Sequence, residues 1–242
     1  MILLTGATGT SGSEIAKELL RRHVPFRALV RSAAKARNLE TGGVELVEGD
    51  LDQPESLDRA LEGIQRALIL SAPDPRSVEQ QGNFINASKR AGVKHIVKFS
   101  AMGAAINSPA FLLKWHGQIE EELQRSGIPF TALQPNSFMQ NFLGMKATIA
   151  QGAIYAPMKQ TPLTLVDTRD IAAVAATTLT EAGHEGRIYV ITGPEALTHD
   201  EIAAKLSAAL GHPVKYADVP LDAFNQSLRQ AGLPGWLADW YH

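Results

Sequence analysis

The sequence predicts an α/β protein with a doubly wound parallel sheet and a small C-terminal lobe. Short apolar runs rich in β-branched residues alternate with longer amphipathic runs, which is the pattern of βαβ units. Glycines at positions 6, 9 and 12 follow the first apolar run. After Pro135 the alternation gives way to single elements, which is typical of a lobe added to a main sheet.

Composition fits an ordinary globular domain. The 242 residues are 45% hydrophobic and 20% charged, enough for one large core, or one core with a small lobe. A net charge of -2 without blocks of like charge argues against direct binding to nucleic acid or to an anionic membrane. The lack of cysteine excludes disulfides and thiolate chemistry. Because no apolar run approaches the roughly 20 residues of a membrane helix and no signal peptide is recognisable, we expect a cytoplasmic protein.

The first 135 residues are expected to form successive strand and helix units of one sheet. Glycines at 63, 92 and 127 are placed to end three of the helices. Strands are expected at 1–5, 26–30, 44–48, 67–71, 95–100 and 129–133. Helices are expected at 12–22, from a capped start at 52–55 to Gly63, at 78–91 and at 110–126.

Beyond Pro135 the expected elements are shorter and more mixed. No internal repeat and no long linker separates this part as an independent domain. We expect helices at 138–150, 168–179, 198–210 and from Leu221 onward, and strands at 163–166, 187–191 and 214–216.

The glycine triplet lies between the first strand and its helix. Gly6 permits a tight turn, Gly9 lets a diphosphate approach the backbone, and Gly12 allows close packing of helix against strand. The backbone N–H groups and the dipole at the helix start bind a pyrophosphate. The spacing is one residue longer than the usual dinucleotide fingerprint. The same loop includes Thr8, Thr10 and Ser11.

This loop predicts a nicotinamide-dinucleotide-binding protein with a Rossmann-like sheet and a small C-terminal substrate lobe. We assign residues 1–135 to the NAD(P)-binding domain. Residues 136–242 are then mostly a substrate-binding lobe, with elements that return to the main sheet, so that the two parts form one structural unit.

The end of the second strand favours NADP(H) over NAD(H). NAD sites place an acidic residue here for the ribose 2′-hydroxyl, whereas this strand ends in Arg31. Arg31, with Lys35 behind it, can pair with a 2′-phosphate. The alternative is that both are solvated surface charges.

Later strand ends supply further candidate cofactor contacts. Asp50 either accepts a hydrogen bond from the adenine amino group or forms a turn with its preceding glycine. Asp52 is expected to cap the next helix. From topology alone, the remaining contacts are assigned to Leu51, Ser71, Ala72, Pro73, Gln134 and Pro135.

The candidate reacting site is the carboxyl end of the fifth strand, because ligands bind at this edge of open α/β sheets. Ser100 ends that strand, and three polar residues of the following helix could approach it: Lys114, His116 and Glu120. His116 and Glu120 form an i,i+4 pair on one face of this helix. His116 either lines the site or has a structural role. Asn136 could orient a carboxamide or a substrate carbonyl. The other histidines have no metal-ligand spacing, so we expect no metal.

Apolar residues after the sixth strand have two possible roles. Phe138, Met139 and Phe142 are spaced as one face of a helix, which is typical of core packing. The alternative is that they form, with Met102, an apolar wall for a flat aromatic substrate.

The motifs resemble those of atypical short-chain dehydrogenases/reductases of the NmrA-like group, over nearly the whole chain. The matching segments are Thr5-Gly-Ala-Thr-Gly-Thr-Ser-Gly12, Ala28-Leu-Val-Arg31, Leu133-Gln-Pro-Asn-Ser-Phe-Met139, Val166-Asp-Thr-Arg-Asp-Ile-Ala172 and Thr192-Gly-Pro-Glu-Ala-Leu197. The His116-x-x-x-Glu120 helix, followed by Gly127-Ile-Pro-Phe-Thr131, is similar to type 2 NADPH:quinone oxidoreductases and triphenylmethane or azo dye reductases.

The resemblance implies a reductase with unusual machinery. Typical family reductases carry Tyr-x-x-x-Lys on this helix, and here Leu112 and His116 stand in those positions. A ketone needs such a proton donor, whereas a reduced quinone or dye is a weakly basic anion that solvent can protonate. We therefore expect NADPH to reduce a quinone or similar flat acceptor, with Ser100, His116 and Asn136 orienting it.

The resemblance also leaves a second reading open. The NmrA-like group includes NADP-binding regulators, so the chain could be a non-catalytic redox sensor or transcriptional regulator. An epimerase or dehydratase is a weaker alternative for want of the tyrosine. The expected partner is a small aromatic or quinone-like molecule, and the expected state is a monomer or homodimer.

Overall fold

The computed structural model describes residues 1–39 and 42–238, and the chain divides into two units. Residues 1–135 and 168–191 form the first, called here the sheet unit. Residues 136–167 and the described residues from Thr192 onward form the second, called the small unit. The helix and strand that follow Asp167 therefore belong to the sheet unit.

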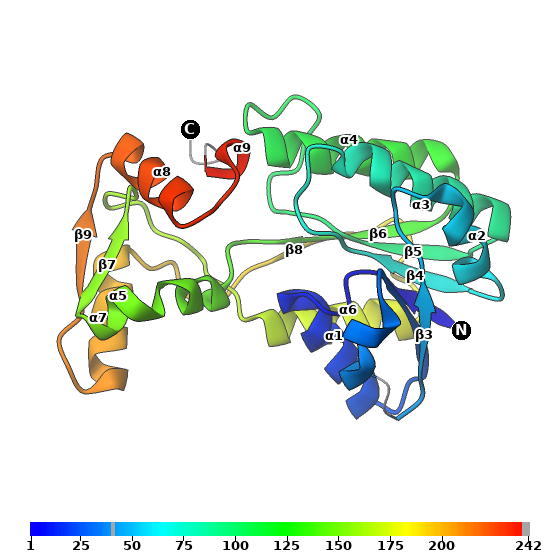
Figure 1. The fold of residues 1–242 in the computed structure, drawn as a ribbon, viewed down its shortest axis with the longest axis horizontal. Coiled ribbons are helices and arrows are strands. Elements are labelled where there is room, and N and C mark those ends of the chain that lie inside the picture. The colour runs from blue at the N-terminus through cyan, green and yellow to red at the C-terminus, as the bar shows by residue number, and fades with distance from the viewer. Residues whose placement is uncertain (40–41, 239–242) are drawn as a thin grey trace. The chain divides into compact units, whose positions relative to one another are not determined.

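The sheet unit contains seven parallel strands in the order β3-β2-β1-β4-β5-β6-β8 (Figure 1). The strand order reverses at β1 and β4, which creates the switch point of a doubly wound sheet. The predicted Rossmann-like α/β class is therefore confirmed. The strands are β1 (Ile2–Leu4), β2 (Phe26–Val30), β3 (Val44–Glu48), β4 (Arg66–Ile69), β5 (His95–Phe99), β6 (Phe130–Pro135) and β8 (Ile188–Ile191).

Helices cover both faces of this sheet (Figure 1). One face carries α2 (Pro54–Leu61), α3 (Ser77–Ala91) and α4 (Phe111–Ser126), and the other carries α1 (Thr10–Arg21) and α6 (Thr168–Thr180). A hydrophobic core lies under α2, α3 and α4, where Leu57, Phe84 and Ile119 are buried with residues of the sheet such as Leu3 and Ile96. Two short 3₁₀ helices, η1 (Ala33–Lys35) and η2 (Arg37–Leu39), follow β2.

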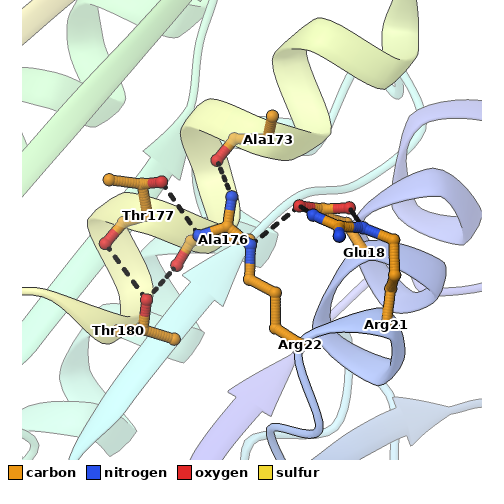
Figure 2. A network of polar contacts seen from close by, with 7 residues as sticks. All are labelled: Glu18, Arg21, Arg22, Ala173, Ala176, Thr177 and Thr180. Carbon is orange, nitrogen blue, oxygen red and sulfur yellow. Dashed lines mark hydrogen bonds and ion pairs between the residues drawn. The ribbon is translucent and has the colours of Figure 1, made fainter.

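A polar network joins α1 to α6, although the two helices are far apart in the sequence (Figure 2). Arg22 donates hydrogen bonds to the Thr177 hydroxyl (3.0 Å) and the Ala173 carbonyl (3.2 Å). Glu18 accepts from both Arg21 and Arg22. These two bonds, Arg21 first, lower the pKa of Glu18 to about 2. The network therefore fixes the helix that carries the glycine loop against the sheet unit's last helix.

The start of α2 differs from the prediction. Its N-cap is Gln53, without a side-chain cap bond, and Pro54 occupies the first turn. Asp52 instead accepts hydrogen bonds from Arg76 (2.7 Å) and Gln80 (3.2 Å). The expected Asp52 cap was therefore wrong, because a cation and an amide near the start of α3 compete successfully for its carboxylate.

The small unit is built around the two parallel strands β7 (Ala153–Ala156) and β9 (Lys215–Asp218). Ile154 of β7 packs in a core with Ile149, Leu165 and Ile202. The helical elements are η3 (Met139–Met145), α5 (Lys146–Ala150), α7 (His199–Leu210), α8 (Leu221–Gln230) and α9 (Gly235–Ala238).

Three expectations for the small unit were wrong in detail. Residues 138–150 form a 3₁₀ helix and then one short α-helix, and Gly144 near the junction weakens a continuous helix. The expected strand at 163–166 makes only isolated bridges, with Leu197 and Phe138. Strand β7 was missed because two of its four residues, Ala153 and Ala156, are alanines, which are depleted in strands.

Candidate functional site

The glycine loop after β1 has the tight geometry that its sequence predicts. Gly6 has a φ of +67°, and a Cβ there would lie 2.7 Å from the Leu70 carbonyl oxygen. A Cβ on Gly12 would lie only 2.0 Å from the Gly6 carbonyl oxygen. The Thr5 hydroxyl donates to the Leu70 carbonyl (2.7 Å) and accepts from the Leu70 N–H (2.8 Å), so the ends of β1 and β4 are tied together.

The loop is open where a diphosphate would approach. A Cβ on Gly9 would meet only the Gly6 carbonyl oxygen, at 3.4 Å, and Thr8, Gly9 and Thr10 are exposed. Within the described residues, the N–H groups of Thr10, Ser11 and Gly12 have no acceptor. Free N–H groups at the start of a helix are the donors that bind phosphate oxygens. The loop therefore fits the diphosphate of a dinucleotide.

The two cations after β2 are available to a ligand. Arg31 and Lys35 are exposed, and neither side chain has an ion pair or hydrogen bond within residues 1–39 and 42–238. The nearby Glu48 carboxylate instead accepts from the Ala33 N–H (2.8 Å). This geometry fits a 2′-phosphate contact and also fits solvated charges, so the two alternatives remain.

Asp50 forms the turn that was one of its two expected roles. Its carboxylate accepts from the Asp52 N–H (3.1 Å), and its own N–H donates to the Ser56 hydroxyl (2.9 Å). The neighbouring Leu51 packs against the main core. At the end of β4, Ser71 accepts a hydrogen bond from Gln81 (2.9 Å), whereas Ala72 and Pro73 are exposed.

A cluster of five polar side chains lies between β5, β6 and α4 and is called here the buried polar cluster: Lys98, Ser100, His116, Glu120 and Gln134. The Ser100 hydroxyl donates to the Glu120 carboxylate. Gln134 donates to both oxygens of Glu120, at 3.0 and 3.2 Å. Ser100 and Gln134 are both buried, so the half-buried carboxyl group of Glu120 is held by donors from the inner side of the cluster.

Lys98 forms the inner end of this cluster. It is fully buried, and its ammonium group donates to the Phe99 carbonyl and lies 3.1 Å from His116 Nδ1. Burial lowers the pKa of Lys98 to about 7, and the charge of Glu120 opposes this shift. Lys98 therefore exchanges its proton near neutral pH.

His116 is neutral and joins Lys98 to the surface. Burial, followed by the charge of Lys98, lowers the pKa of His116 to about 2. Because an ammonium group only donates, Nδ1 is the acceptor and the ring proton lies on Nε2. Within the described chain, Nε2 has no hydrogen-bond partner, yet it is not among the buried polar atoms that lack one. The Nε2–H therefore reaches the molecular surface.

The predicted residues of the small unit make local contacts. Asn136 donates to the Thr164 hydroxyl (2.6 Å) and accepts from the Ser137 N–H (2.8 Å). Phe142 packs against the small unit's core, with its ring 6.1 Å from that of His199. Phe138 is half-buried and bridges to Val166, whereas Met139 is exposed.

The structure brings three predicted residues, Ser100, His116 and Gln134, into one cluster of the sheet unit. Met102, also in this unit, is exposed and donates its N–H to the Pro135 carbonyl (3.0 Å). Of the helix residues expected to approach Ser100, Glu120 accepts its hydrogen bond, whereas His116 contacts Lys98. Sequence reasoning missed Lys98, although a lysine inside an otherwise apolar central strand was a usable signal.

Membrane-spanning helices and metal-binding clusters are both absent from the described residues. In residues 1–39 and 42–238, no helix is long and apolar enough to cross a membrane. The same residues hold no group of three or more histidine, aspartate or glutamate side chains placed to bind a metal ion.

The sheet order, the open glycine loop and the strand-end cluster define a Rossmann-like α/β protein. Residues 1–235 match the NmrA-like family, and the chain belongs to this family.

Named relatives are similar over almost the whole chain. The chain is 43% identical to an NAD(P)H azoreductase of Xenophilus azovorans, over 99% of this chain and 84% of the relative. Its fold matches an Escherichia coli NADPH-dependent quinone oxidoreductase solved with NADPH (TM-score 0.90, 34% identity, 99% and 86% of the two chains). It also matches a Citrobacter sp. triphenylmethane reductase solved with NADP(H) (TM-score 0.89, 33% identity, 99% and 86%).

Proposed function

We propose that this protein is an NADPH-dependent reductase that transfers a hydride to a quinone or a similar flat, conjugated acceptor. The observation that carries the proposal is the open loop from Gly6 to Gly12, with free N–H groups beside a cleared approach to Gly9. The relatives' names support it: one is an NAD(P)H azoreductase, one an NADPH-dependent quinone oxidoreductase and one a triphenylmethane reductase.

The proposed cofactor contacts follow the strand ends. The loop residues bind the diphosphate, and Arg31 with Lys35 binds the 2′-phosphate, which gives the preference for NADP(H). When bound, the reduced nicotinamide supplies the hydride. The other proposed contacts are Asp50 and Leu51 for the adenine, Ser71, Ala72 and Pro73 for the second ribose, and Gln134 and Pro135 for the nicotinamide end.

The acceptor class follows from what this chain lacks. Leu112 and His116 stand where related carbonyl reductases carry tyrosine and lysine. A flat conjugated acceptor spreads the charge that arrives with the hydride, so it depends less on a strong acid at the reacting atom. We propose that Ser100 and His116 orient this acceptor. Asn136, Met102, Phe138, Met139 and Phe142 are proposed as its further contacts.

A direct assay tests the proposal. Purified protein is mixed with NADPH and a panel of benzoquinones, naphthoquinones, azo dyes and triphenylmethane dyes, with NADH in parallel. We expect acceptor-dependent NADPH oxidation well above the uncatalysed rate, and slower oxidation of NADH. NADPH binding without turnover for any acceptor would contradict the reductase and favour the redox sensor.

A further inference from the structure

The link between Lys98 and His116 has a direction. Its inner atom is the fully buried Lys98 Nζ, its middle is the neutral His116 ring, and its outer atom is Nε2, which has no hydrogen-bond partner in residues 1–39 and 42–238. Nδ1 of the ring lies 3.1 Å from Nζ, so the ring connects this outer atom to the buried lysine. A neutral imidazole in this position passes a proton by exchanging tautomers, without itself becoming charged.

The charged and polar groups around Lys98 and His116 determine which of these two residues carries the extra proton. Lys98 faces His116 and Glu120, and Glu120 is held by Ser100 and Gln134. Glu120 favours the charged form of Lys98, while burial opposes it, so the lysine pKa is about 7. His116, with a pKa of about 2, stays neutral and stores no proton.

We propose that Lys98 and His116 form an internal proton relay, which delivers a proton to the reduced acceptor from the buried lysine instead of from bulk solvent. This inference rests on the proposed reductase function. It assigns Lys98 a role as a relay residue that acts through His116.

The step balances in atoms and charge. A quinone that has taken a hydride is an anion with both electrons in place and one proton missing. The His116 Nε2–H bond breaks as the acceptor O–H bond forms, and a Lys98 Nζ–H bond breaks as Nδ1–H forms. Lys98 becomes a neutral amine, and His116 becomes its other neutral tautomer. After the product leaves, a solvent proton adds at Nε2 and the Nδ1 proton returns to Lys98.

Two types of acceptor distinguish a proton relay through Lys98 and His116 from a purely structural role of these residues. A quinone or azo bond needs a proton as well as a hydride. A cationic triphenylmethane dye needs the hydride alone, because hydride addition to its central carbon gives a neutral product. Loss of the relay should therefore slow quinone reduction relative to dye reduction, whereas loss of packing should slow both.

The kinetic test compares quinone and dye turnover by wild type, Lys98→Met, His116→Gln and the double variant. Glutamine keeps an acceptor and a donor but cannot exchange tautomers. We expect each single variant to lower the quinone-to-dye rate ratio about tenfold or more, and the double variant to lower it no further, because the two residues act in series. The exposed Lys94→Met is the matched control and should keep the wild-type ratio.

The pH dependence of the quinone-to-dye rate ratio is a second measurement, and a purely structural role of Lys98 would not change it. In wild type, the quinone-to-dye ratio should fall as pH rises through about 7, where Lys98 loses its proton. This fall should be absent in Lys98→Met. Equal loss of both activities, or an unchanged ratio in both single variants, would overturn the relay while leaving the reductase intact. Wild type that reduces neither acceptor would contradict the proposed function itself.

A spectroscopic test examines the link without nucleotide, acceptor or turnover. Nitrogen-15 NMR of the histidine side chains should show His116 as the neutral Nε2–H tautomer from pH 5 upward. Its Nδ1 shift should move with a midpoint near 7, following Lys98, and should not move in Lys98→Met. Protonation of His116 with an ordinary histidine midpoint, or a fixed Nδ1–H tautomer in wild type, would overturn the relay.

Discussion

Gly9 is the loop residue whose substitution best separates binding from folding. Its backbone is extended, with φ -83° and ψ 174°, and a Cβ there would meet only one protein atom, at 3.4 Å. Valine is therefore tolerated by the fold but fills the approach to the free N–H groups. We expect Gly9→Val to weaken NADPH binding at least about tenfold, ~1.4 kcal/mol, with little change in the unfolding midpoint. Calorimetric titration and thermal unfolding measure the two effects.

The neighbouring Gly12 is the contrasting control. A Cβ there would lie 2.0 Å from the Gly6 carbonyl oxygen, so Gly12→Ala should lower stability as well as binding. Unchanged NADPH affinity in Gly9→Val would show that the diphosphate lies elsewhere.

Arg31 is expected to decide the choice between the two cofactors. Its side chain makes no hydrogen bond or ion pair with the described residues, so Arg31→Glu removes no such bond. The variant should bind NADPH at least about tenfold more weakly and prefer NADH, because a carboxylate repels the 2′-phosphate and can accept from a 2′-hydroxyl. Titration with both nucleotides measures this preference. Lys94→Glu makes the same charge change at the start of β5 and should leave the preference unaltered; if Arg31→Glu also leaves it unaltered, both cations are only surface charges.

Lys98 should make stability depend on pH. Its pKa is about 7 in the folded protein, against 10.5 as the ordinary value. Between these values the unfolded chain binds more protons, so the free energy of unfolding rises with pH, by up to about 1.4 kcal/mol per pH unit. Below pH 7 both states hold the proton and this rise stops. Urea unfolding from pH 7 to 9 should show the rise in wild type and Lys94→Met; the same rise in Lys98→Met would exclude Lys98 as its source.

At the scale of elements, one arginine supplies the side-chain hydrogen bonds from the end of α1 to α6. Arg22 is three-quarters buried and bonds to two residues of α6, whereas Arg21 bonds only within α1 and is exposed. We expect Arg22→Ala to lower the free energy of unfolding by about 1–3 kcal/mol, and Arg21→Ala by no more than about 0.5. Chemical denaturation of both variants tests this. Equal losses of free energy would mean that the ion pairs with Glu18, which both arginines make, carry the stabilisation and that the bonds to α6 add nothing.

The same scale shows why the sequence predicted some elements and missed others. Strands β1, β2, β4, β5 and β6 are largely buried, so each gives a mainly apolar run bounded by turns, and α3 and α4 end at the predicted Gly92 and Gly127. The edge strand β3 is mostly not buried and was predicted from its alternating valine, leucine and glutamate residues. The small unit gives a weaker signal, because residues 163–166 pack as single bridges and two of the four residues of β7 are alanines.

The candidate site shows a similar limit. The loop geometry at Gly6 and Gly12 follows from local glycine spacing and could be predicted. The pairing of Lys98 with His116 could not, since it depends on the register of α4 against β5. The approach of Glu120 to Ser100 was among the expectations for this helix, whereas the bond from Gln134 to Glu120 was not, because it depends on how β6 packs beside α4.

For the whole molecule, the sheet order brings the glycine loop and the buried polar cluster to one edge of the sheet. Parallel strands place the loop after β1 and the end of β5 at the same edge of the sheet, with only β4 between them. The protein thereby presents free N–H donors and a protonatable cluster at one edge. This arrangement, together with the family, leads to the central claim of direct hydride transfer from NADPH.

Deuterium tracing tests that claim most directly. Protein is incubated with NADPH carrying deuterium at the transferred position of the nicotinamide and with a cationic triphenylmethane dye, and the reduced dye is analysed by mass spectrometry. We expect one deuterium on the central carbon of each reduced dye molecule, because a C–D bond formed by direct transfer does not exchange with water. Reduced dye without deuterium, or no reduced dye at all, would contradict the claim.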